Sequence, residues 1–161
     1  MRPIVLLRRF LLPPYVITVL AYLKFGAKVS HRAEVELSSL LWLGKGVVVK
    51  PRAKIKASEG PISIGSGTTI GEGAVIGGHI HGVMIGEHCT IGSAVTIMGV
   101  NYRYDRIDIP IREQGLVSKG PIKIGDRVEI GAGAVILDAS EIGSGAVIAP
   151  RAVVSGRIAS Q

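Results

Sequence analysis

The stretch from Ile64 to Gly78, "IGSGTTIGEGAVIGG", repeats one short pattern in steps of six residues. Each step begins with an isoleucine followed directly by a glycine, at Ile64, Ile70 and Ile76. An amphipathic helix needs apolar residues at a spacing of about 3.6 and a half-buried strand needs strict alternation, so neither explains this period. A six-residue period with one inward-facing aliphatic residue per step is typical of a β-helix.

The register extends in both directions from this stretch. Three steps would make one coil, and 3 × 6 = 18, so we expect residues 18 apart in the sequence to stack at the strand spacing of about 4.8 Å. We predict an all-β fold in which one aliphatic residue per step forms the core and glycine occupies many of the corners. The predicted core positions are Leu43, Val49, Ile55, Ile64, Ile70, Ile76, Ile85, Ile91, Ile97, Ile124, Ile130, Ile136, Ile142, Ile148 and Val154.

The six-residue register is interrupted after Ile55, after Ile76 and after Ile97. Between Ile76 and Ile85 the step is nine residues, which we attribute to a bulge at Gly82-Val83-Met84. From Ile97 to Ile124 the step is 27 residues, and it includes the polar stretch "NYRYDRIDIPIREQG", which we predict to leave the solenoid as a loop over 98–123. Long polar excursions from a rigid scaffold are usually functional, although a tolerated surface insertion is the alternative.

The first third of the chain is basic and begins with an apolar segment. Residues 1–56 carry 11 Lys or Arg against two Glu, or +9, whereas residues 57–161 carry 8 against 10, or −2. The apolar run from Phe10 to Leu23 is short for a membrane span, and Pro13 and Pro14 break it. We therefore predict an N-terminal helical segment, 1–26, with short helices over about 3–12 and 14–24, followed by a β-helix domain over 27–161.

These N-terminal helices have two possible roles. They could cover the open end of the β-helix, which is an exposed sheet edge, or they could attach the protein to an anionic membrane surface. Both roles are compatible. The single Cys89 excludes a disulfide framework, fits a small core position, and suits the cytoplasm or the inner face of the plasma membrane. The sequence argues against a nucleic-acid partner, because its basic residues are interleaved with aliphatic rather than aromatic side chains.

The sequence "IGSAVTIMGVNYRYDRIDIPIREQG…GPIKIGDRVEIGAGAVIL" resembles the hexapeptide-repeat acyltransferases, in particular the sugar O-acetyltransferases of the maltose, galactoside and polysaccharide-modifying kind. The resemblance covers about residues 40–156. It implies a left-handed parallel β-helix, a homotrimer, acetyl-CoA bound between neighbouring subunits, and transfer of the acetyl group to a sugar, here a cell-envelope polysaccharide precursor. It implies no metal cofactor.

The catalytic pattern of that family is altered in this chain. The family has a histidine base at the start of the excursion, in a pattern like N-H-x-x-D, whereas this sequence has Asn101 and Asp105 with Tyr102 at the histidine position. A tyrosine phenol, with an ordinary pKa of about 10, is a far weaker base at neutral pH than an imidazole. If Tyr102 and His81 stack on one edge of the solenoid, His81 could supply the base. An amine acceptor, which needs a weaker base, is the second explanation.

The resemblance also implies cofactor-binding positions. Ala132 stands where a small residue contacts the pantetheine arm, and Pro150 and Ser155 stand at positions on the adenylate side. The basic C-terminal tail of the family is replaced by "GRIASQ", which leaves Arg151 and Arg157 as candidate partners of the CoA phosphates.

Two other functions remain open from the sequence. A non-catalytic relative, acting as a trimeric scaffold or regulatory partner, is favoured by Tyr102 and by Glu129, which replaces an aromatic residue in the pantetheine-binding coil. A zinc enzyme like the carbonic anhydrases of the same fold needs three histidines across a trimer interface, which is disfavoured here because the histidines cluster between 79 and 88 with none later.

Overall fold

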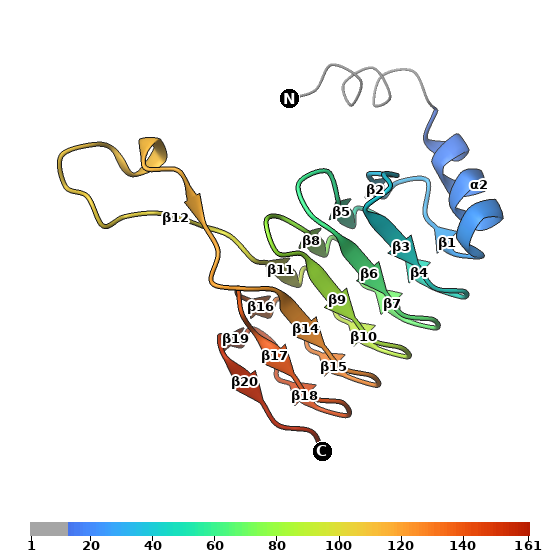
Figure 1. Cartoon of the computed structure of the whole chain (residues 1–161). Coiled ribbons are helices and arrows are strands. Elements are labelled where there is room, and N and C mark those ends of the chain that lie inside the picture. Colours follow the sequence, from blue (N-terminus) through green and yellow to red (C-terminus); the bar gives the residue numbers. More distant parts are fainter. Residues whose placement is uncertain (1–12) are drawn as a thin grey trace.

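The computed structural model of the chain describes residues 13–161 and contains three parallel sheets of six strands each. Figure 1 shows the strands stacked in coils along one axis. Sheet A consists of β1 (Lys28–Val29), β4 (Val48–Val49), β7 (Thr69–Ile70), β10 (Thr90–Ile91), β15 (Glu129–Ile130) and β18 (Val147–Ile148). Sheet B consists of β2 (Glu34–Val35), β5 (Lys54–Lys56), β8 (Val75–Gly77), β11 (Thr96–Met98), β16 (Val135–Ile136) and β19 (Val153–Val154). Sheet C consists of β3 (Leu41–Leu43), β6 (Ile62–Ile64), β9 (Val83–Ile85), β14 (Ile122–Ile124), β17 (Glu141–Ile142) and β20 (Arg157–Ile158).

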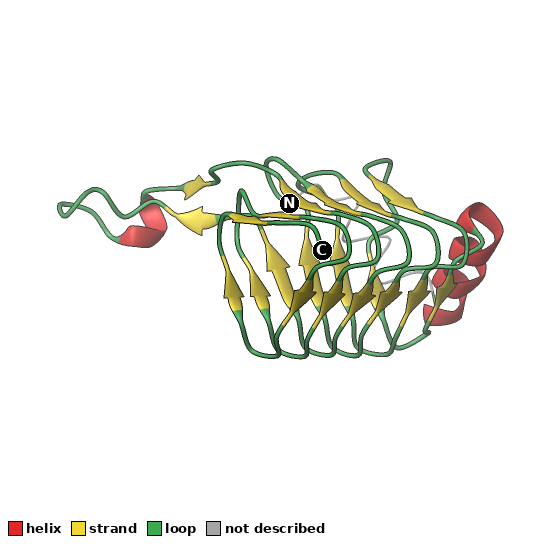
Figure 2. Cartoon of the chain, turned by 90° about the horizontal axis from the view of Figure 1, so that it is seen from below, coloured by secondary structure: helices red, strands yellow, loops and turns green. Residues whose placement is uncertain are grey.

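Each coil contributes one strand to sheet A, one to sheet B and one to sheet C, in that order along the chain. The arrangement is a β-solenoid of about six turns that fits a left-handed β-helix, so the predicted fold class is confirmed. Figure 2 shows that the strands of successive coils lie side by side and follow one another along the solenoid axis.

The predicted aliphatic positions form the core. Every one of them is buried, including Ile64, Ile70 and Ile76 of the stretch quoted first. In the two-residue strands, such as β7 and β10, only the second residue points inward, which explains why the sequence shows one core residue per step. Cys89 is also buried, as expected for a small core position.

The stacking period differs between the two halves of the solenoid. After the excursion it is 18, as predicted, with Ile130 pairing with Ile148, except that the last pair of sheet C, Ile142 with Ile158, is 16 apart. Before the excursion it is 20 or 21, with Val29 pairing with Val49 and Val49 with Ile70. The predicted bulge at Gly82-Val83-Met84 is therefore wrong. Val83 is buried in β9. Compared with the regular coil formed by β16, the connection 137–140 and β17, this step has three additional residues, one in β8, one in the connection 78–82 and one in β9.

The three edges of the solenoid differ in how regular they are. Every connection from sheet A to sheet B has four residues, as in 71–74, and so does every connection from sheet C to sheet A, as in 86–89. The connections from sheet B to sheet C vary, from 57–61 and 78–82 to the excursion 99–121. We call this variable edge the B–C edge and the edge between sheets A and B the A–B edge.

Helix α2 (Pro14–Phe25) lies against the first coil. Proline is well placed at the first helical turn because its missing N–H has no partner there anyway. The helix ends at Gly26, whose left-handed backbone (φ 65°) lets its N–H donate to Tyr22 O at 2.8 Å. The other expected helix, over 3–12, lies outside the described residues.

Candidate active site

The excursion 99–121 is built on the B–C edge of the fourth coil, between β11 and β14. Its base is a short antiparallel pair, β12 (Asn101–Tyr102) with β13 (Leu116–Val117), in which Tyr102 lies opposite Leu116. Figures 1 and 2 both show this hairpin projecting away from the solenoid body. Tyr102 is about half exposed and Asp105 is exposed in the outer part of the hairpin.

The outer part of the excursion is organised by the side chain of Gln114. Its Nε2 donates to Arg106 O at 2.6 Å and to Ile109 O at 3.1 Å, and its Oε1 accepts from Arg106 N at 3.0 Å. Beside it, the 3₁₀ turn η1 (Ile111–Glu113) follows Pro110. The Arg106 guanidinium is paired with Asp108 and holds the pKa of that carboxyl below its usual range. The tip is thus a defined structure made of its own polar side chains.

Asp138 joins the excursion to the solenoid, and the sequence did not suggest it. It lies on the B–C edge of the next coil and is only 7% exposed. One carboxylate oxygen accepts from Asn101 Nδ2 at 3.4 Å and the other from Lys119 N at 2.7 Å. The available signal was the acid in "ILDASEIG", two residues after the core residue Ile136.

His81 and Tyr102 lie on the same edge in successive coils. β8 pairs with β11 through Ile76 and Ile97, so the connection with His81 is one coil before the excursion. His81 is exposed, and no hydrogen bond joins it to Tyr102 among residues 13–161. Its neighbour His79 has a side-chain partner, since its Nδ1 lies 2.7 Å from Glu59 Oε2.

Three of the candidate cofactor residues lie together on the A–B edge. Ala132 follows β15, and Pro150 and Arg151 follow β18, one coil later. The N–H of Arg151 donates to Ala132 O at 2.9 Å, which fixes the two corners against each other. The Arg151 side chain is exposed. These residues are separated from the B–C edge by the width of sheet B.

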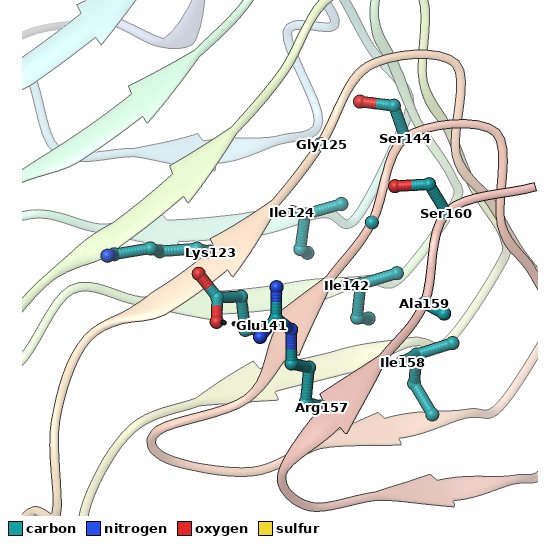
Figure 3. Close-up of a pocket in the computed structure, with 11 residues that line it drawn as sticks. Lys123, Ile124, Gly125, Glu141, Ile142, Ser144, Arg157, Ile158, Ala159 and Ser160 are labelled. Atoms are coloured by element: carbon teal, nitrogen blue, oxygen red, sulfur yellow. Dashed lines mark ion pairs between the residues drawn. The ribbon is translucent and has the colours of Figure 1, made fainter.

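The other two candidates lie at the end of the solenoid. Ser155 is exposed on the B–C edge, and Arg157 belongs to β20 in sheet C. A cavity of about 310 Å³ lies over β14, β17 and β20, and Figure 3 shows Lys123, Glu141 and Arg157 at one end of it and Ser144 and Ser160 at the other. Arg157 Nε lies 3.8 Å from Glu141 Oε2. This ion pair offsets the charge that Arg157 would offer to a phosphate.

Within residues 13–161 no three His, Cys, Asp or Glu side chains are grouped so that they could hold a metal ion. The polar groups gather instead on the B–C edge, around Asn101, Tyr102 and Asp138.

Residues 121–156 match the family described as bacterial transferase hexapeptide, six repeats. The chain is 32% identical to a probable acetyltransferase of Mycobacterium tuberculosis over 153 residues, and this aligned region is 95% of the chain. The chain spans about half, 50%, of the length of that relative.

Solved structures share the fold. An N-acyltransferase from Bacillus cereus, AntD, in complex with dTDP and 3-hydroxybutyryl-CoA, superimposes with a TM-score of 0.75 at 18% identity, over 88% of this chain and 79% of that one. A perosamine N-acetyltransferase from Caulobacter crescentus, in complex with CoA and GDP-perosamine, gives a TM-score of 0.61 at 19% identity, over 92% of this chain and 60% of that one. Residues 121–156 are therefore similar to the hexapeptide transferase family, and the same coil-by-coil repetition runs through the rest of the solenoid.

Proposed function

We propose that this protein is an acyl-CoA-dependent acyltransferase that moves an acetyl group from acetyl-CoA to a hydroxyl or amine of a sugar. The observation that carries the proposal is the ordered excursion on the B–C edge, tied to the solenoid through Asn101 and Asp138. Its polar groups stand beside a rigid scaffold, which is the usual location of residues that bind and react. The similarity to a probable acetyltransferase supports the donor, and the two acyltransferase structures were solved with CoA or an acyl-CoA.

The reaction requires the acceptor to attack the thioester carbonyl while it loses a proton. The C–S bond then breaks, the acyl group stays on the acceptor oxygen or nitrogen, and the CoA sulfur leaves as a thiolate that takes up a proton. A neutral amine attacks with little help, whereas a hydroxyl needs a base at the moment of attack. Tyr102 at the usual base position therefore favours an amino sugar, and both solved relatives are N-acyltransferases. His81 is the candidate base for either acceptor, with Asn101 and Asp105 orienting the sugar.

We propose that the complete site forms between subunits of a homotrimer. Ala132, Pro150 and Arg151 lie on the A–B edge, whereas His81 and Tyr102 lie on the B–C edge of the same prism. A threefold arrangement of prisms would bring the A–B edge of one subunit toward the B–C edge of the next. Acetyl-CoA would then contact Ala132, Pro150 and Ser155, with its phosphates on Arg151 and, more weakly, on Arg157. The acceptor that we propose is a cell-envelope polysaccharide precursor.

The alternative is a scaffold or regulatory protein that has lost catalysis. The observation that favours it is the absence of a hydrogen bond between His81 and Tyr102 in the described chain, which leaves no assembled base. Binding of CoA without turnover would be the signature of this alternative.

Isothermal titration of acetyl-CoA and CoA tests the proposal, with thiol release measured on a panel of amino and neutral sugar nucleotides. We expect micromolar binding by the wild type and turnover that is lost in His81→Ala. Arg151→Gln should weaken CoA binding. Arg52→Gln is the control and should leave CoA binding unchanged, because Arg52 lies at the same kind of left-handed corner near the other end of the solenoid (φ 61° for Arg52, 60° for Arg151). No binding by the wild type, or turnover only in Tyr102→His, would favour the scaffold.

A further inference from the structure

Helix α2 is apolar on all sides, although the solenoid covers only one of them. Ala21 is fully buried, and Ile17 and Phe25 pack against the core, so positions four apart form the covered face. Thr18 and Lys24 are the polar residues of the sequence "PYVITVLAYLKF" apart from its two tyrosines. A helix that is hydrophobic all round is normally buried on all sides.

The uncovered face carries large apolar side chains. Its exposed residues are Tyr15, Val19, Leu20, Tyr22 and Leu23, of which Leu23 is 75% exposed. A cavity of about 300 Å³ lies between this face and β1, lined mainly by apolar residues of the helix together with Ala27 and Val29. Among the described residues that line it, Lys28 is the one with a charged side chain. The helix and the excursion lie toward opposite sides of the solenoid in both Figures 1 and 2.

The charge at this end of the chain has one sign. No Asp or Glu occurs in residues 1–33, which contain the basic residues Arg2, Arg8, Arg9, Lys24, Lys28 and Arg32. Lys24 and Lys28 flank the end of the helix and are exposed, and Lys45 lies close to Gly26. A second copy of this surface would bring like charges together, whereas an anionic surface would attract them.

We propose that the exposed face of α2 docks on an anionic lipid surface, with Val19, Tyr22 and Leu23 entering the headgroup region and Lys24 and Lys28 contacting lipid phosphates. The helix would lie in the membrane plane. At 12 residues it is about 18 Å long, against a hydrocarbon core of about 30 Å. None of the helices within residues 13–161 is long and apolar enough to span a bilayer. The attachment does not depend on the acyl-transfer proposal, because it uses a different end of the molecule.

Co-sedimentation of the full chain with vesicles tests this surface. We expect binding to vesicles of equimolar phosphatidylcholine and phosphatidylglycerol, weaker binding as salt is added, and little binding to phosphatidylcholine alone. Val19→Glu should weaken binding at least about tenfold, because it places a carboxylate on the docking face. Lys24→Glu with Lys28→Glu should weaken it as well.

The matched control is Val147→Glu, which changes a valine of similar exposure, 59% against 54% for Val19, near the other end of the solenoid. It should leave vesicle binding unchanged. Titration with CoA on the same variants separates this proposal from the proposed function. The lipid proposal is overturned if the wild type does not sediment with anionic vesicles, or if Val19→Glu and Val147→Glu have equal effects. A fall in molar mass by light scattering in Val19→Glu, with vesicle binding intact, would also overturn it and would identify a second copy as the partner.

Discussion

The side-chain amide of Asn101 donates to the carboxylate of Asp138 at 3.4 Å, although the two residues are 37 positions apart in the sequence. The other oxygen of the same carboxylate accepts the N–H of Lys119 at 2.7 Å. One residue of the next coil therefore connects the beginning of the excursion to its end. Because Asp138 is largely buried, water competes little for its carboxylate oxygens.

Replacing Asp138 by alanine should release the hairpin from the solenoid. Loss of the carboxylate leaves the Lys119 N–H without its partner, and we expect a loss of about 1–3 kcal/mol in the free energy of unfolding. Trypsin should then cut more rapidly within the excursion, at Arg103, Arg106 and Arg112. Urea denaturation and timed proteolysis measure the two effects.

Asp126→Ala is the control for this change. The Asp126 carboxylate also accepts a main-chain N–H, from Glu87 at 2.8 Å, but it lies on the edge between sheets C and A. Because this hydrogen bond is exposed and water can replace the carboxylate, we expect a smaller loss of stability than in Asp138→Ala and no faster cleavage of the excursion. Equal acceleration of cleavage in the two variants would contradict a specific role for Asp138.

The difference between Ile70 and Asp138 shows what the sequence could and could not predict. The position of Ile70 follows from a local repeat, since each coil needs one aliphatic residue at each inward point. The contact of Asp138 with Asn101 depends on which coil follows the excursion and on how far the edge opens, and no local pattern encodes either. The placement of His81 was predictable to the correct edge, because it needed only a count of coils, but its exposure was not.

Gly60→Ala should disrupt the B–C edge of the second coil. A Cβ on Gly60 would lie 1.5 Å from the carbonyl oxygen of His79 in the next coil, so the two backbones would have to separate. We expect a loss of about 3 kcal/mol or more in the free energy of unfolding. A Cβ on Gly73 would meet no atom within 4 Å, but the backbone there is left-handed, with φ +67°. Gly73→Ala should therefore lower the free energy of unfolding by only about 1–2 kcal/mol, the cost of holding an alanine in that conformation. Equal losses in chemical denaturation would contradict the close approach at Gly60.

Cys89 should make stability fall at alkaline pH. Burial raises the pKa of its thiol, and the Sγ lies 3.0 Å from Gly125 O, to which it donates. The folded state therefore keeps its proton at pH values where the unfolded chain loses it, so stability falls as pH rises above the ordinary thiol pKa of about 8.5. Urea denaturation between neutral pH and pH about 10 should show this fall in the wild type and less of it in Cys89→Ala. A pH profile that is identical in both proteins would refute the assignment.

The Arg106–Asp108 pair should keep the tip of the excursion ordered in moderate acid. Arg106 Nε donates to Asp108 Oδ1 at 3.0 Å, and this pairing lowers the pKa of the carboxyl. A group with a lowered pKa in the folded state contributes stability above its ordinary pKa, about 3.9 for Asp, and the contribution disappears as pH falls through the lowered value. Carbon NMR titration of the Asp108 carboxyl should give a midpoint below that of Arg106→Gln, in which the carboxyl should titrate near its ordinary value. Arg112→Gln is the control, because it removes an exposed charge from the same excursion and leaves the Arg106–Asp108 pair intact. In this variant the Asp108 carboxyl should titrate as in the wild type. A shift as large as in Arg106→Gln would mean that the general charge of the excursion, rather than this pair, sets the pKa.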